Sequence, residues 1–155
     1  MPTQKLKNAL DENNIKYVTI NHSQAFTAQE IAASAHIKGD EFAKTVILKI
    51  DGKMAMAVLP ASYSIDFSEL DQLGLGESVR LANEMEFKDR FPGCEVGAMP
   101  PFGNLYDMPV YVAESLMKDE EIAFNSGTHK ELIKMKTEDY VKLVNPLTLK
   151  FSKKS

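Results

Sequence analysis

The chain has 155 residues, which fits one domain with a single hydrophobic core, so we expect one domain over 1–155. Eighteen basic and 22 acidic residues give a net charge of −4, which argues against DNA as a partner, because a long footprint on nucleic acid depends on neutralised phosphates. The longest apolar run, 54–59, is far shorter than the roughly 20 residues that cross a membrane. The single cysteine, Cys94, fits a reducing compartment, so we expect a cytoplasmic protein without a membrane partner.

The N-terminal segment predicts a helix, a strand and a second helix. Apolar residues recur at helical spacing over 6–10, and 17–20 then reads as a short strand. Thr27 and Glu30 have the spacing of a capping box, in which each side chain satisfies a backbone group at a helix start. A second helix is therefore expected over 28–35.

The middle of the chain carries the clearest strand signal. Apolar residues fill 45–50 and 53–59, on either side of Asp51-Gly52. This dipeptide accepts the positive φ angles that a two-residue hairpin turn needs. The sequence therefore predicts a β-hairpin.

Helices and strands interleave irregularly through the rest of the chain. Apolar spacing predicts a short helix over 67–73, and a capping box of Asn83 and Glu86 predicts another that reaches about Phe91. Four further strands are expected, with a helix capped by Thr137 before the last: 110–113, 121–125, 131–135 and 147–151. This order favours the mixed α+β class, with helices around a mixed sheet, over a doubly wound parallel sheet.

Several common kinds of site do not match the sequence. His22, His36 and His129 have neither the mutual spacing nor the neighbouring ligands of a zinc site. The chain has no G-x-S-x-G elbow and no glycine-rich phosphate loop. We therefore expect an enzyme of this sequence to work without a metal, a nucleotide cofactor or a covalent serine.

A lysine stands at the mouth of the predicted hairpin. Strand alternation places Lys44 on the same face as Val46, Leu48 and Ile50. One interpretation is a strand-end lysine whose stem lies along apolar surface while its ammonium stays in solvent. The other is a partly desolvated ammonium in a cleft, which would attract a carbonyl, carboxylate or phosphate oxygen.

Two further segments are unusual. In 97–103, Pro100 and Pro101 restrict the backbone between two glycines, as in an ordinary proline turn or in a stiff loop that holds N–H donors ready for developing negative charge. The segment 126–129, Ser-Gly-Thr-His, follows an apolar strand and can present backbone donors, a hydroxyl and an imidazole together. A lone histidine is often structural, so the role of His129 stays open from spacing alone.

Taken in order, Lys44-Thr45, the Gly-x-x-Pro-Pro-Phe-Gly loop of 97–103 and the Asn-Ser-Gly-Thr-His turn of 125–129 resemble the YbaK and prolyl-tRNA-synthetase-associated editing domain family. The resemblance runs from about residue 22 to residue 145. It implies a curved, partly barrel-like mixed sheet with helices packed around it, and neither metal nor cofactor. It also implies trans-editing, the hydrolysis by water of the ester that joins a small, wrong amino acid to its tRNA.

The resemblance also implies a site and partners. Catalytic roles fall on Lys44, Gly127 and His129. Substrate-binding roles fall on His22, Thr45, Gly97, Met99, Pro100, Pro101, Phe102, Gly103 and Thr128. The implied partners are the acceptor end of aminoacyl-tRNA and a tRNA synthetase, with the protein a monomer or weak dimer. Two alternatives stay open: a module of the same fold that binds tRNA ends or an amino-acid-like ligand without turnover, and a hydrolase of small esters unrelated to tRNA.

Overall fold

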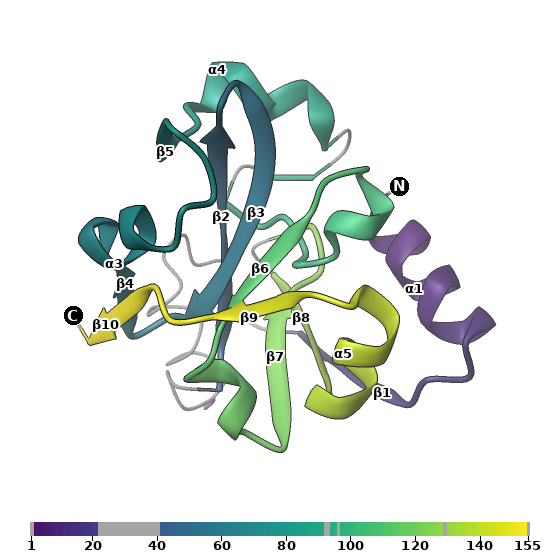
Figure 1. The fold of residues 1–155 in the computed structure, drawn as a ribbon. Helices are drawn as coiled ribbons and strands as arrows, with labels where there is room; N and C mark the ends of the chain where they lie inside the picture. The colour runs from purple at the N-terminus through teal and green to yellow at the C-terminus, as the bar shows by residue number, and fades with distance from the viewer. Residues whose placement is uncertain (1, 22–40, 92–93, 96, 129, 155) are drawn as a thin grey trace.

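A computed structural model describes residues 2–21, 41–91, 94–95, 97–128 and 130–154. Figure 1 shows these residues as a ribbon coloured from purple at the N-terminus to yellow at the C-terminus. The predicted helix over 28–35 lies outside the described residues, and so do His22 and His129. In the described ranges, no helix has the length and apolar composition that crossing a membrane requires.

The elements follow one another in an irregular order of helices and strands. The helices are α1 (Pro2–Glu12), α3 (Phe67–Gln72), α4 (Glu84–Phe87) and α5 (Thr137–Val144), with 3-10 turns η1 (Lys88–Arg90), η2 (Gly103–Leu105) and η3 (Leu116–Lys118). The strands are β1 (Tyr17–Asn21), β2 (Ala43–Ile50), β3 (Lys53–Pro60), β4 (Tyr63–Ile65), β5 (Val79–Leu81), β6 (Val110–Ala113), β7 (Glu121–Asn125), β8 (Glu131–Lys136), β9 (Leu147–Leu149) and β10 (Ser152–Lys154).

The strands form a mixed sheet around the predicted hairpin. One sheet has the order β5-β2-β3-β6-β9, in which β2 and β3 are antiparallel and β6 runs parallel to both β3 and β9. A second sheet has the antiparallel order β1-β8-β7. A parallel bridge between Phe42 and Ala123 joins the two sheets along the edge of β2. The α+β class with a mixed sheet is thus confirmed, and the sheet remains open (Figure 1).

The β2–β3 hairpin separates two apolar clusters. The larger contains Ala43 and Ile47 from one face of β2, together with Phe102 and Phe124. The smaller contains Leu48 from the other face, with Leu59, Leu70 and Phe151. Val46 and Ile50 pack against this second cluster, as the predicted alternation requires. Lys44 therefore lies on the face of β2 that belongs to the smaller cluster.

Local sequence signals explain the hairpin and helix α4. Asp51 and Gly52 both have positive φ, at 50° and 84°, as the two-residue turn requires. Asn83 and Glu86 form the predicted capping box, each side chain accepting from the other residue's backbone N–H. The α-helical part ends at Phe87, and a 3-10 turn continues the chain to Arg90.

Two details of the prediction are wrong. The residue before α5 is Lys136, which gives no side-chain cap, and Thr137 is the first helical residue. Strand β8 runs directly into α5, so no loop residue precedes the helix to act as its cap. The Thr137 N–H donates to the Glu120 carbonyl at 2.9 Å. The predicted strand 147–151 is too long: β9 ends at Leu149, Phe151 is buried in the smaller cluster, and a separate strand, β10, begins at Ser152 and pairs with β4.

Candidate functional site

Lys44 lies near the start of β2, opposite Leu59 of β3. Its side chain is partly buried, and this burial lowers the pKa of the ammonium below the usual value for lysine. Nζ donates to the carbonyl of Ala61 at 3.5 Å, the outer limit of a hydrogen bond. Because an ammonium has three donors, this long contact leaves Lys44 able to bind a ligand oxygen.

The second half of the loop 97–103 is held by contacts with the core. The buried hydroxyl of Tyr140 on α5 donates to the Pro101 carbonyl at 2.7 Å, and burial raises the pKa of Tyr140, so it stays a donor at neutral pH. The Phe102 ring lies against the Tyr140 ring, with centroids 5.3 Å apart. Gly97 has a φ of 86°, a conformation that favours glycine. The loop is therefore fixed in its shape by named contacts.

The turn after β7 lies directly against this loop. Gly127 is buried with a φ of 118°, and its carbonyl accepts a hydrogen bond from the Glu95 N–H at 2.8 Å. Phe124 on β7 packs against Phe102, with ring centroids 5.3 Å apart. Thr128 is partly exposed, and its hydroxyl accepts from the Lys130 N–H at 3.3 Å. The structure thus brings the proline loop and the glycine turn together.

The bridge between β2 and β7 relates Lys44 to this turn. Phe42 and Ala123 are paired in parallel, so their side chains share one face of the sheet. Two residues further along each strand, Lys44 and Asn125 fall on that same face. Lys44 therefore lies beside the strand that leads into the glycine turn.

The other face of the same strands carries the predicted substrate-binding side chains of the loop. Thr45 alternates with Lys44 and points to the larger cluster, which contains Met99 and Phe102. Met99 and Phe102 are buried, at 5% and 0% exposure, and Pro100, Pro101 and Gly103 are buried as well. These buried side chains anchor the loop to the larger cluster, on the side of the sheet opposite to Lys44.

Asn125 did not emerge from the motifs as a separate candidate. Its side chain is 6% exposed, and Oδ1 has no hydrogen-bond partner among the described residues. The signal in the sequence was a polar residue at the end of the apolar run 122–124, directly before the Ser-Gly turn.

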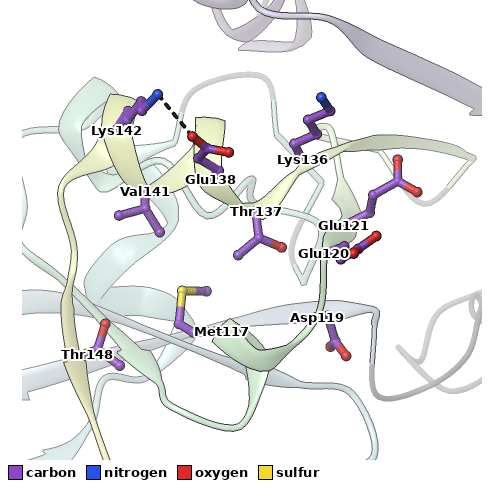
Figure 2. A pocket seen from close by; sticks show the side chains of 10 residues that line it. All are labelled: Met117, Asp119, Glu120, Glu121, Lys136, Thr137, Glu138, Val141, Lys142 and Thr148. Atoms are coloured by element: carbon purple, nitrogen blue, oxygen red, sulfur yellow. Dashed lines mark ion pairs between the residues drawn. The ribbon is translucent and has the colours of Figure 1, made fainter.

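A hollow of about 980 Å³ lies elsewhere, between α5, β9 and the segment before β7 (Figure 2). Its lining includes four carboxylates, those of Asp119, Glu120, Glu121 and Glu138, and none of the predicted site residues. An ion pair of Lys142 with Glu138, at 3.2 Å, occupies one of its two lysines. So many carboxylates repel tRNA phosphates, and we do not place the tRNA site here. Across the described ranges, no three His, Cys, Asp or Glu side chains converge as metal ligands do.

Replacing Tyr140 by Phe tests whether the loop depends on its buried hydrogen bond. The ring contacts remain, but the Pro101 carbonyl loses its donor, so we expect the free energy of unfolding to fall by about 1–3 kcal/mol. Urea denaturation measures this change. Tyr111→Phe, at a partly exposed position on β6, is the matched control and should be close to neutral. A neutral Tyr140→Phe would show that the loop does not need this bond.

Comparisons with known proteins identify the family of the chain. The model of the aminoacyl-tRNA editing domain matches residues 22–143. The Escherichia coli K12 protein named multifunctional Ser/Thr-tRNA deacylase ProXp-y is 27% identical over 154 residues, covering 96% of this chain and 91% of that protein. The crystal structure of the hypothetical protein APE2540 has a TM-score of 0.85 at 19% identity, over 96% of this chain and 99% of that one.

A second solved structure has the same fold over nearly the whole chain. The crystal structure of a protein proposed to be a trans-editing enzyme for prolyl-tRNA synthetase has a TM-score of 0.81 at 19% identity, and covers 98% of this chain and 97% of its own. The family model spans most of the chain, including all three motifs on which the resemblance rests. The protein therefore belongs to the aminoacyl-tRNA editing domain family.

Proposed function

We propose that the protein is a trans-editing deacylase that hydrolyses the ester between a small amino acid and the 3′ end of a mischarged tRNA, with water as the nucleophile. Family membership gives the enzyme class, an aminoacyl-tRNA deacylase. The name of the Escherichia coli relative favours serine and threonine as the esterified amino acids. A tRNA substrate places the reaction in the cytoplasm, with a tRNA synthetase as a further partner.

The observation that carries the proposal is the meeting of the three motifs around the end of β7. The Glu95 to Gly127 hydrogen bond joins the segment just before the loop to the turn, Phe102 of the loop packs against Phe124 of β7, and the Phe42–Ala123 bridge puts Lys44 beside the strand that leads into the turn. A cation and a glycine turn thus lie at the same end of the sheet. These groups are suited to binding and polarising an ester.

In this mechanism Lys44 binds an oxygen of the terminal nucleotide or of the ester. The ester carbonyl becomes an oxyanion when water attacks, and backbone N–H groups of the loop and of Gly127 stabilise it. One well-placed donor of this kind lowers the barrier by about 3–4 kcal/mol. His129 assists as a further polar group at the turn, and the free ribose hydroxyl of the substrate assists the attack.

The remaining predicted residues shape the amino-acid pocket. Gly97 and Thr128 border the turn and the loop, and Thr45, Met99 and Phe102 hold the loop from the core side. Pro100, Pro101 and Gly103 keep the loop in one conformation, and His22 contributes to substrate binding. In this proposal the site admits a small amino acid and excludes the larger, correct one. A synthetase needs such a second site because one methylene changes binding by only about 1–3 kcal/mol.

A panel of mischarged tRNAs tests the proposal directly. We expect the purified protein to deacylate tRNA that is mischarged with serine or threonine faster than tRNA that carries its correct amino acid. The measurement is the loss of the labelled ester. If no tRNA of the panel is deacylated at high protein concentration and low salt, the proposed enzymatic activity is contradicted and the binding module without turnover is favoured. Equal hydrolysis of free aminoacyl esters would instead favour a small-ester hydrolase that ignores the tRNA.

A further inference from the structure

Asn125 is a buried polar residue without an evident structural role. Its side chain is only 6% exposed, and its Oδ1 atom accepts no hydrogen bond from the described residues. Buried acceptors are nearly always satisfied in folded proteins, because an unpaired one costs free energy. A bound ligand that donates a hydrogen bond to Oδ1 would explain why this unpaired acceptor is present.

The position of Asn125 fits a ligand-binding role. It is the last residue of β7, directly before Ser126 and the buried Gly127. The parallel bridge between Phe42 and Ala123 gives it the same sheet face as Lys44, at the corresponding position of the neighbouring strand. Lys44 and Asn125 therefore share one face where the two strands lie side by side, and we expect one ligand to contact both side chains.

The end of an aminoacyl-tRNA offers two kinds of donor to such an acceptor. One is the α-ammonium of the amino acid, and the other is the ribose hydroxyl that stays free next to the ester. A second ammonium beside Lys44 is disfavoured by charge repulsion in a partly desolvated site. A neutral hydroxyl carries no such penalty.

We propose that Asn125 Oδ1 accepts a hydrogen bond from the free ribose hydroxyl next to the aminoacyl ester, an inference that rests on the proposed function. Asn125 is then a binding residue that identifies the terminal ribose of a ribonucleotide. Together with Lys44 it fixes the sugar from two sides, so that the ester faces the glycine turn.

Binding of stable substrate analogues tests this role without turnover. The probes are tRNAs that end in 3′-serylamino-3′-deoxyadenosine, in which an amide replaces the ester, with either a hydroxyl or a hydrogen at the 2′ position. We expect loss of the hydroxyl to weaken wild-type binding about tenfold, the effect of one hydrogen bond to a prepared acceptor. The Asn125→Leu variant should bind both probes equally, at the level of the wild type with the deoxy probe.

Several controls separate this proposal from others. Asn125→Leu should keep the wild-type melting temperature, because an apolar group replaces an unpaired acceptor of similar size, and Asn125→Ala serves as a second variant. Asn8→Leu, on the exposed face of α1, is the matched control and should keep full discrimination between the probes.

Discrimination that persists in both Asn125 variants would overturn the proposal. A third probe lacks the α-amino group. The proposal would also be overturned if wild-type affinity fell with this probe and the Asn125 variants no longer distinguished it from the probe that has the group. Deacylation by the wild type is measured separately, on seryl-tRNA. Turnover without hydroxyl discrimination contradicts the role of Asn125, whereas absence of turnover contradicts the proposed function itself.

Discussion

Replacing Lys44 by Ala is expected to reduce kcat/KM for deacylation by a factor of about 100–1,000, the usual effect of removing one electrostatic group from a hydrolytic site. Stability should hardly change. The ammonium has only a long contact of 3.5 Å to the Ala61 carbonyl, and the burial that lowers its pKa works against the charged form. A large loss of rate with an unchanged melting temperature would assign Lys44 to the reaction.

Two further substitutions make this result specific. Lys53→Ala removes an exposed lysine at the far end of the same hairpin and should leave the rate unchanged. Lys44→Arg keeps a positive charge but changes its geometry, so we expect partial activity. If Lys44→Ala loses stability and activity in proportion, the residue is a structural strand-end lysine, and the proposed mechanism loses its cation.

The parts of the fold that depend on neighbouring residues could be predicted from the sequence. The hairpin follows from Asp51-Gly52 between two apolar runs, and α4 begins at the capping box of Asn83 and Glu86. Other parts depend on distant contacts. Strand β10 pairs with β4 across more than half of the chain, and three-residue strands such as β5 carry too few residues to show alternation.

The candidate site shows the same division. The motifs of Lys44, the proline loop and the glycine turn are visible as unusual local sequences. Their arrangement is not, because it depends on the Phe42–Ala123 bridge between segments about 80 residues apart. That bridge puts Asn125 on the same face as Lys44, whereas the side chains of Met99 and Phe102 pack in the larger cluster on the opposite face.

Replacing Gly103 by Ala is expected to destabilise the protein by overpacking. A Cβ atom at this position would lie 2.6 Å from the Met108 carbonyl oxygen and 2.6 Å from Val110 Cγ2. The Gly103 carbonyl also accepts from the N–H groups of Tyr106 and Met108, at 2.9 and 3.0 Å, so the backbone has little freedom to move away. Overpacking of this kind costs about 1–3 kcal/mol, and thermal denaturation measures it.

The same clash provides a test of whether the rigidity of the loop serves catalysis. Combining Val110→Ala with Gly103→Ala removes the contact with Val110 Cγ2 but keeps the contact with the Met108 carbonyl oxygen. The double variant should therefore lose less stability than the sum of the two single losses, but it should stay less stable than the Val110→Ala variant. Asn104→Ala, at the exposed neighbour, is the control and should be close to neutral. If the N–H donors of the loop must be held ready for the oxyanion, kcat falls further than the folded fraction does. A destabilised Gly103→Ala protein with wild-type kcat in its folded fraction would show that the loop serves the fold alone.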